Sequence, residues 1–402
     1  MVLRGRHGSS AYVFSLKAHS LAVSLDDTQV AAWDRGGRLY SLSIGDLTWR
    51  RGLSGHVLEK RQSPEGRTRT RLVPADAGHV VDNAAAIARD ALRAVETTAW
   101  RWNEGVDGLV TQELRTLLRL CARFDAAAGR ADAVRFAEVY QPVGILPPDQ
   151  YLSLVVQATA GCSFNTCTFC DLYHEHYQVK TPDQFRAHVS AVRQYLGESI
   201  HLRSRGIFLG AANALAVPMA RLLPMFEILA EDMDGVTRGV CAFVDGFTGT
   251  HKHTSDYRAL RDLGLRRVYV GLESGHDPLL SFVRKPGTAA EAIDTVRAIK
   301  DAGVQVGVIV MVGLGGERYA TGHQDDTTAA LNAMGLGAGD LLYFSELVEM
   351  PGTVYPIVVH NEAIAPLSKE ARRAQQHAIR SGLRFSGLPP QLAVYDVREF
   401  VY

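Results

Sequence analysis

The pattern of apolar and polar residues in the first third of the chain predicts β-structure followed by helices. Short β-branched or aromatic runs lie between residues 10 and 72, separated by aspartate and glycine pairs as hairpins require. Between residues 80 and 138 apolar residues recur at helical spacing instead. We therefore expect a β-rich accessory segment at 1–75 and a helical one at 76–145. The runs are Tyr12–Leu16, Ala22–Leu25, Gln29–Trp33 and Arg38–Ile44, and the helical stripes are Ala84–Trp102 and Leu114–Phe124.

After Pro142, Pro147 and Pro148 the rhythm becomes strand, polar loop and helix, repeated. Dense apolar strands in such βα units are typical of a parallel sheet buried on both faces. Six units are too few for a closed eightfold barrel, so the prediction is an α/β fold with a partial (β/α)6 barrel at 146–365, followed by a C-terminal helix and tail at 366–402. The predicted strands are Leu152–Gln157, Gly206–Gly210, Arg238–Phe243, Arg267–Leu272, Gln305–Val312 and Leu341–Leu347, and predicted helices begin at Thr181 and span Ser255–Leu263, Ala289–Ala302 and Asp326–Met334.

Three of the five cysteines lie directly after the first of these strands. Cys162, Cys167 and Cys170 have Cys-x4-Cys-x2-Cys spacing, at the carboxyl end of a strand, where the chemistry of such folds is found. Three clustered thiolates suit a metal or an iron–sulfur cluster, whereas an odd number at short spacing does not suit a disulfide framework. The isolated Cys121 and Cys241 lie in a predicted helix and a predicted strand, so we expect buried core thiols, with hydrogen-atom donation as the alternative for Cys241.

Composition narrows the possible partners. The 402 residues are 47% hydrophobic and 21% charged with zero net charge, which gives no whole-chain case for nucleic acid or a membrane surface. The chain has no signal-peptide core and no apolar run near the roughly 18–20 residues of a membrane span, so we expect a cytoplasmic protein. From Arg35 to Arg71 there are nine basic residues against three acidic ones. This stretch is either a solvated hairpin edge or a docking patch for an acidic partner.

The cysteines alone leave two alternatives, a zinc ion or an iron–sulfur cluster, and later segments of the chain help to choose between them. With His174 the cysteines form Cys-x4-Cys-x2-Cys-x3-His, a plausible Cys3His zinc site. Taken in order with Gly264–Gly275, Gly307–Gly316 and Met350–Thr353, however, the trio resembles the radical S-adenosylmethionine (SAM) superfamily over about residues 150–365. The chain departs from the family pattern by one extra residue in the usual Cys-x3-Cys-x2-Cys, and by Phe208–Asn213 in place of a Gly-Gly-Glu segment.

The resemblance implies a 4Fe–4S cluster on three cysteines, with SAM on the fourth iron. An electron donor such as flavodoxin or ferredoxin would reduce the cluster, and cleavage of SAM would give a 5′-deoxyadenosyl radical that abstracts hydrogen from substrate. Only two further cysteines remain, too few for a second cysteine-ligated cluster. The sequence also lacks an Asp-x-His-x-x-Gly cobalamin segment. We therefore expect a single-cluster enzyme.

The resemblance also assigns site residues. The expected metal ligands are Cys162, Cys167 and Cys170, and the candidate catalytic residues, after the third and sixth predicted strands, are Asp245, His251, His253 and Glu346. The pair Arg284-Lys285 is placed to meet the SAM carboxylate. A dinucleotide site at Gly313–Gly316 lacks the full glycine fingerprint. The expected cofactor-binding residues are Phe169, Gly210, Asn213, Glu273, Ser274, Arg284, Val310, Gly313 and Met350.

Three hypotheses follow. The leading one is a radical SAM enzyme acting on a small molecule or a peptide. The second keeps the enzyme class but makes RNA the substrate, with Arg35–Arg71 as the contact, and the neutral overall charge argues against it. The third is a non-enzymatic Cys3His zinc protein.

Overall fold

The computed structural model describes residues 1–63, 66–203, 205–233, 238–249 and 251–402. The chain forms two compact units. The first comprises Met1–Gln141, Ser190–Ser204 and Arg398–Tyr402, and the second comprises Pro142–Val189 and Arg205–Val397. Among the helices of the described ranges, none is both long enough and apolar enough to cross a lipid bilayer.

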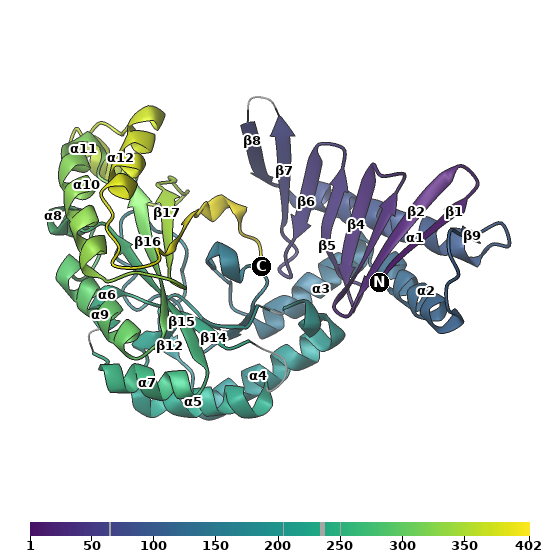
Figure 1. Cartoon of the computed structure of the whole chain (residues 1–402), viewed down its shortest axis with the longest axis horizontal. Helices are drawn as coiled ribbons and strands as arrows, with labels where there is room; N and C mark the ends of the chain where they lie inside the picture. Colours follow the sequence, from purple (N-terminus) through teal and green to yellow (C-terminus); the bar gives the residue numbers. More distant parts are fainter. Residues whose placement is uncertain (64–65, 204, 234–237, 250) are drawn as a thin grey trace. The chain divides into compact units, whose positions relative to one another are not determined.

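The first unit contains an antiparallel sheet in which, within the described residues, nine strands lie in the order β8-β7-β6-β5-β4-β3-β2-β1-β9 (Figure 1). Successive hairpins join β1 to β8, as the predicted runs and turns require. The strands are β1 (Val2–His7), β2 (Ser10–Lys17), β3 (Ser20–Leu25), β4 (Gln29–Asp34), β5 (Leu39–Ile44), β6 (Leu47–Arg51), β7 (Val57–Ser63), β8 (Gly66–Arg71) and β9 (Arg101–Trp102). The helices are α1 (Pro74–Glu96), α2 (Gly108–Arg123) and α3 (Ala126–Val139), with a 3-10 turn at Gly197–Leu202.

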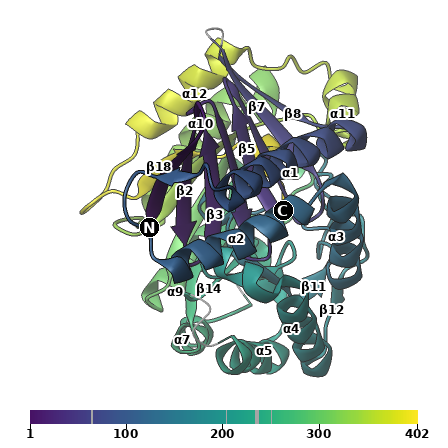
Figure 2. The ribbon, with the colours of Figure 1, turned by 90° about the vertical axis from the view of Figure 1, so that its right-hand side faces the viewer.

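One hydrophobic core joins this sheet to α1 and α2, which lie across one of its faces (Figure 2). Strand β2 contributes alternate residues, Tyr12, Phe14 and Leu16, because successive side chains of a strand point to opposite faces. The alanine-rich face of α1 packs closely on them, and Cys121 of α2 is fully buried in the same core. The first helix, predicted at Ala84–Trp102, begins earlier, at Pro74, and ends earlier, at Glu96.

The basic stretch of the first unit is largely neutralised by internal partners. Arg38 and Arg51 flank the fully buried Asp132, with Arg38 Nε 2.8 Å and Arg51 Nη1 3.6 Å from its carboxylate. Lys60 and Arg69 both pair with Glu399. Two further pairs are Arg35 with Glu113 and Arg61 with Asp46. Six of the nine basic residues between 35 and 71 therefore have acidic partners, which favours a charged sheet edge over a docking patch.

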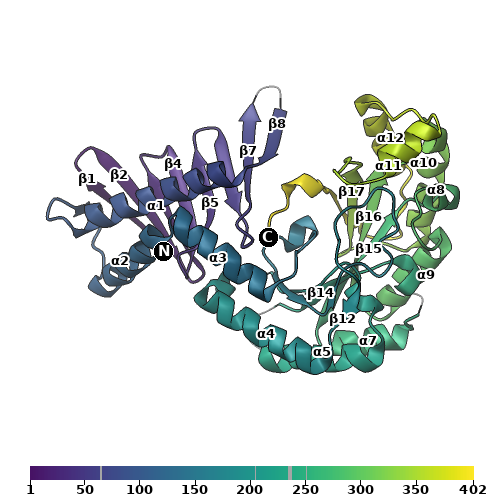
Figure 3. The same cartoon turned by 180° about the vertical axis from the view of Figure 1, so that it is seen from behind.

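The second unit is built on a curved parallel sheet with helices along its outer face (Figure 3). Its order within the described ranges is β10-β13-β14-β15-β16-β17-β18, and all neighbouring pairs are parallel. The strands are β10 (Leu154–Gln157), β13 (Ile207–Gly210), β14 (Val240–Val244), β15 (Leu265–Glu273), β16 (Gln305–Val312), β17 (Leu341–Glu346) and β18 (Gln391–Val394), with a small antiparallel pair of β11 (Thr159–Ala160) and β12 (Gln178–Val179).

The helices of this unit connect the strands in the expected βα rhythm. They are α4 (Pro182–Leu196, whose end belongs to the first unit), α5 (Met219–Asp232), α6 (Gly246–Gly249), α7 (Thr254–Asp262), α8 (Asp277–Phe282), α9 (Ala289–Asp301), α10 (Gly316–Ala333), α11 (Tyr355–Asn361) and α12 (Lys369–Ser381). The predicted α/β partial barrel is confirmed. The expected C-terminal tail is wrong in one respect, because Gln391–Val394 adds a seventh parallel strand. This strand is short and only partly buried, so no dense apolar run reveals it.

Candidate active site

A largely apolar cavity of about 210 Å³ opens at the carboxyl ends of the parallel strands. All three clustered cysteines line it, together with residues in or just after the carboxyl-terminal halves of β14, β15, β16 and β17 and residues that follow β13. The lining includes Cys162, Phe164, Cys167, Phe169, Cys170, Tyr173, Asn213, Phe243, Asp245, Gly271, Glu273, Lys285, Ile309, Met311, Glu346, Met350 and Tyr395.

The cysteine loop is fixed by backbone hydrogen bonds to the elements beneath it. The Thr168 N–H donates to the Val283 carbonyl at 2.9 Å, and the Thr168 carbonyl accepts from the Tyr355 N–H at 3.0 Å. The four-residue spacer between Cys162 and Cys167 passes through Asn165, whose φ of 52° is left-handed. Asparagine is among the few non-glycine residues that adopt this conformation readily. The longer spacer is thus accommodated by a turn at an exposed residue.

The thiols lie close enough to influence one another electrostatically. Burial raises the pKa of Cys167 to about 11, an effect that the Lys285 ammonium opposes and that Cys170 and Glu273 reinforce. Burial also raises the pKa of Cys170. In this apolar pocket the thiolates therefore need a bound cation to remain ionised.

The donor set bears on the choice between a cluster and a single zinc ion. Three cysteines line one cavity, and thiolates are the usual ligands of an iron–sulfur cluster. The His174 side chain is 72% exposed, and its Nδ1 lies 3.6 Å from Asp171. His174 therefore does not complete a Cys3His site.

Strand β15 places Glu273 in the cavity by means of a bulge. The register with β16 shifts between Gly271 and Glu273, and Glu273 itself has a left-handed φ of 59°. Such irregularities redirect a side chain and concentrate at functional sites. Within the described residues, the buried Glu273 Oε2 has no hydrogen-bond partner. A buried acceptor of this kind is suited to a donor on a bound ligand.

Lys285 is the cation nearest this carboxylate. Burial raises the pKa of Glu273, and the Lys285 ammonium partly offsets the effect. Burial disfavours the charged form of Lys285, but Glu273 and Cys167 raise its pKa above the usual value. Lys285 therefore carries a positive charge at neutral pH, between the cysteine loop and Glu273. The pair Arg284-Lys285 was predicted to meet the SAM carboxylate, with Arg284 among the cofactor-binding residues, but Arg284 is exposed and does not line the cavity.

A polar cluster joins the cysteine loop to the ends of β13 and β14. The Asn213 amide donates to Ser163 Oγ at 3.0 Å and to the Asp245 carboxylate. The Thr248 N–H and hydroxyl donate to the two Asp245 oxygens at 2.7 and 2.6 Å. Asn213 and Asp245, which were both predicted site residues, line the cavity. Hydrogen bonds to their neighbours hold both side chains in place.

The remaining candidates separate into two groups. Phe169, Met350 and Glu346 line the cavity, and the Glu346 side chain is 44% exposed with Arg372 Nε 3.9 Å away. His251 and His253 are exposed and lie outside it. The His253 N–H donates to Asp256 at the start of α7, which is a helix-capping role.

Four expected cofactor contacts also lie outside the cavity lining. Val310 is fully buried, and its strand neighbours Ile309 and Met311 line the cavity instead. The Gly313 N–H donates to Gln375 Oε1 at 2.9 Å, and Gly210 borders a separate small cavity. The fourth of these residues is Ser274.

Ser274 takes part in a buried network behind the cavity. His323 Nδ1 lies 2.7 Å from Ser274 Oγ, and His323 Nε2 lies 3.0 Å from the Met311 carbonyl. A carbonyl only accepts, so Nε2 carries the proton and Nδ1 accepts from the serine. Burial lowers the pKa of His323 to about 4, which keeps the ring neutral. This network fixes the backbone beside Met311 rather than contacting a ligand.

Several lining residues were not among the predicted site residues. Phe164 lies in the cysteine spacer, and Phe243 is the penultimate residue of β14. Tyr395 follows β18, the strand that the sequence pattern did not predict. The position of Tyr173, three residues after Cys170, could have signalled its place in the cavity wall.

Comparison with known proteins bears on this cavity. A family model described as the radical SAM superfamily matches residues 156–322. No curated protein matches the chain. Among solved structures, the chain is similar to coproporphyrinogen III oxidase (HemN) from Escherichia coli, with 13% identity, 62% of this chain and 54% of that chain covered, and a TM-score of 0.40.

Two further structures are similar at the same level. Methylornithine synthase (PylB) has 12% identity, 66% and 75% coverage of this chain and that chain, and a TM-score of 0.40. The cobalamin-dependent S-adenosylmethionine radical enzyme OxsB has 12% identity and a TM-score of 0.39, with 57% of this chain covered. The match spans 31% of the length of OxsB.

Proposed function

We propose that the protein is a radical SAM enzyme, a member of the superfamily that works with a 4Fe–4S cluster and SAM, and that it acts on a small molecule or a peptide. One observation carries the proposal. Three cysteines, the Lys285 ammonium and a carboxylate whose buried Oε2 has no hydrogen-bond partner among the described residues line a single apolar cavity at the carboxyl ends of the parallel strands. Enzymes of the superfamily need a reductant, for which a flavodoxin or ferredoxin is our expectation.

The residues fit the cluster. Cys162, Cys167 and Cys170 would hold three irons, leaving one iron for SAM. When bound, cluster and SAM supply a 5′-deoxyadenosyl radical that abstracts hydrogen from substrate. The cysteines must lose their thiol protons to bind the cluster, and burial opposes this loss. The positive charge of Lys285 promotes it, because this charge favours the thiolate of Cys167. Phe169 packs on the loop beside Cys167 and Cys170 and excludes water from it.

Glu273 and Lys285 are our proposed contacts to the polar groups of SAM. The free Oε2 of Glu273 accepts a hydrogen bond from an ammonium or hydroxyl donor, which relieves the cost of its burial. Lys285 pairs with a carboxylate, the role predicted for the pair Arg284-Lys285. Both side chains already line the cavity before SAM arrives, so little reorganisation accompanies binding.

The substrate side of the cavity is mostly apolar. Phe164, Phe243 and Tyr395 provide walls that keep water away from a reactive radical. Both carboxylate oxygens of Asp245 accept hydrogen bonds from Thr248, so we propose that Asp245 fixes the edge of the cavity. The remaining lone pairs of its carboxylate can accept a hydrogen bond from the substrate. Glu346 is the more accessible carboxylate and the better candidate for a polar group of the substrate.

The two alternative hypotheses have less support. RNA recognition through Arg35–Arg71 is disfavoured because six of its nine basic residues already pair with four carboxylates. A Cys3His zinc protein is disfavoured because His174 is exposed and lies outside the cavity.

Anaerobic reconstitution tests the proposal. We expect a brown protein that, once reduced, converts SAM to 5′-deoxyadenosine, and loss of this activity in Cys167→Ala. Cys121→Ala is the matched control, because Cys121 is buried in the first unit and should retain the activity. A colourless zinc-containing protein, or unchanged SAM cleavage by Cys167→Ala, would refute the assignment.

A further inference from the structure

A second cavity lies at the opposite ends of the same parallel strands. It has a volume of about 770 Å³ and is lined by residues that precede or begin β13, β14, β15, β16, β17 and β18. It shares no lining residue with the cysteine cavity, which follows the carboxyl ends of the strands. The lining includes Asp149, Gln150, Arg205, Arg238, Arg266, Arg267, Gln305, Asp340 and the segment Leu388–Gln391.

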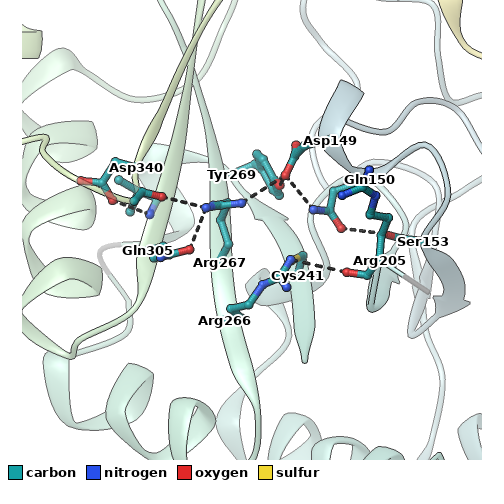
Figure 4. Close-up of polar contacts among 12 residues, drawn as sticks. Asp149, Gln150, Ser153, Arg205, Cys241, Arg266, Arg267, Tyr269, Gln305 and Asp340 are labelled. Carbon is teal, nitrogen blue, oxygen red and sulfur yellow. Dashed lines mark hydrogen bonds and ion pairs between the residues drawn. The ribbon is translucent and has the colours of Figure 1, made fainter. Parts of the chain in front are cut away.

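The charges of this second cavity are unbalanced. Four arginines line it against two aspartates, and both aspartates are already engaged. Asp340 binds the Lys300 ammonium and accepts from the Val306 N–H at 3.0 Å. Asp149 lies 3.1 Å from Arg267 Nη1 and accepts from the Tyr269 hydroxyl at 2.6 Å. Figure 4 shows Arg267 held in this way between Asp149 and Gln305.

A bulge turns Arg266 toward the same cavity as Arg267. Adjacent residues of a regular strand point to opposite faces, but the register of β14 and β15 shifts so that Val240 pairs with Leu265 and Cys241 with Arg267. Arg266 is the extra residue, and a bulged residue can redirect its side chain. Both guanidinium groups therefore line one cavity.

Arg266 has no acidic partner among the described residues. Its terminal nitrogens lie 3.3 Å from the Arg238 carbonyl, 3.5 Å from the Arg205 carbonyl and 3.7 Å from Cys241 Sγ, all long contacts (Figure 4). Its buried Nε has no hydrogen-bond partner within the described residues. Burial raises the pKa of Cys241, so the sulfur is a neutral thiol at neutral pH.

Arg205 and Arg238 flank Arg266 on the rim of the cavity. Both are exposed, and no carboxylate in the described part of the chain pairs with either of them. Three guanidinium groups around one concavity, each free of an acidic partner there, repel one another unless an anion lies between them. Planar guanidinium forks are the side chains best suited to hold the oxygens of a phosphate group.

We propose that this cavity binds a small phosphate-bearing molecule, with Arg266 as the inner contact and Arg205 and Arg238 at the rim. The site is concave, and Pro389 and Pro390 contribute part of its wall, which suits a compact ligand. The net charge of the whole chain is zero, which gives no whole-chain electrostatic attraction for a nucleic acid. This binding site is independent of SAM cleavage and does not rest on the proposed function.

Calorimetric titration of the reconstituted protein with inorganic pyrophosphate tests the site. We expect saturable binding that Arg266→Gln combined with Arg238→Gln weakens at least tenfold, since the two substitutions remove two charged hydrogen-bond donors to the anion. Arg258→Gln, on the exposed face of α7, is the matched control and should bind as the unmodified protein does. Ribose 5-phosphate against ribose distinguishes a phosphorylated metabolite from a free phosphate species.

A single substitution at an exposed position tests the proposal even if the double variant does not fold. Arg205 is exposed, so Arg205→Gln should fold normally and lose much of the pyrophosphate-induced rise in thermal unfolding temperature. Absence of saturable binding, or equal binding by the arginine variants, would overturn the proposal. Tighter binding of a single-stranded RNA oligonucleotide, lost in the same variants, would overturn it in favour of nucleic acid. SAM cleavage is measured separately on every variant, so each proposal can fail without the other.

Discussion

The substitution Gly271→Ala offers a sharp test of the role of Glu273. An alanine Cβ at position 271 would lie 2.6 Å from Glu273 Oε1, whereas ordinary contact begins at 3.4 Å. The carboxylate must therefore move by about 0.8 Å, the difference between these two distances. Gly271 does not have a left-handed φ, so alanine causes no backbone strain there. The added methyl group should displace one carboxylate without destabilising the fold.

The size of the effect follows from what the displaced carboxylate is proposed to do. A hydrogen bond to a charged group contributes roughly 1.5–3 kcal/mol, which corresponds to about tenfold to hundredfold in affinity. Misplacement of a reacting group by about 1 Å can also cost about a hundredfold in rate. We therefore expect SAM binding to weaken at least tenfold and 5′-deoxyadenosine formation to fall further.

Equilibrium dialysis of SAM against the reconstituted protein measures the first effect, and a thermal scan monitors the fold. Gly105→Ala is the matched control, because its Cβ would meet no atom within 4 Å. A double-mutant cycle with Glu273→Ala supplies the decisive comparison, since substitutions that act through one side chain are not additive. Unchanged SAM affinity in Gly271→Ala, or full additivity with Glu273→Ala, would show that the displaced carboxylate does not bind SAM.

Two further predictions concern stability. Burial lowers the pKa of His323 to about 4 in the folded protein, against about 6.5 in the unfolded chain, so the unfolded state binds more protons between these values and stability falls as pH drops from about 6.5 to 4. Urea unfolding across this range should show a steeper acid loss than in His323→Asn, and parallel curves would contradict the assignment. Asp132→Ala should lower the free energy of unfolding by about 3–5 kcal/mol, because it leaves two buried guanidinium groups unpaired. Asp90→Ala, which removes an exposed pair, is the control, and an equal loss in both variants would refute the argument.

The barrel and the gathering of three cysteines at one cavity were predictable because each follows from a local pattern. Apolar strands alternate with helices over hundreds of residues, and three cysteines within one loop allow few chemistries. The seventh strand was not predictable in this way. Gln391–Val394 is short and partly exposed, and only its backbone pairing with β17 defines it. Tyr395 belongs to the cavity solely because that pairing places it there.

The finer site residues depended on orientation, which sequence spacing does not provide. Val310 and Met311 are neighbours on one strand, and alternation directs only the second toward the cavity. Arg284 and Lys285 are likewise adjacent, but only Lys285 lines the cavity. A resemblance identifies such a segment, whereas the choice between two adjacent side chains depends on how the strand or turn is rotated.

Strand β15 shows why neither of its two sites could be read from alternation alone. A regular strand of nine residues would direct Arg266 and Arg267 to opposite faces, and its final carboxylate would follow the same alternation. The register instead shifts at both ends, against β14 at Arg266 and against β16 before Glu273. Each shift places a charged side chain in a separate cavity, and in each of them one buried polar atom, Arg266 Nε or Glu273 Oε2, has no hydrogen-bond partner among the described residues. Bulges weaken the ladder locally and often mark functional sites, so their presence at both ends of a central strand supports the two proposed binding sites.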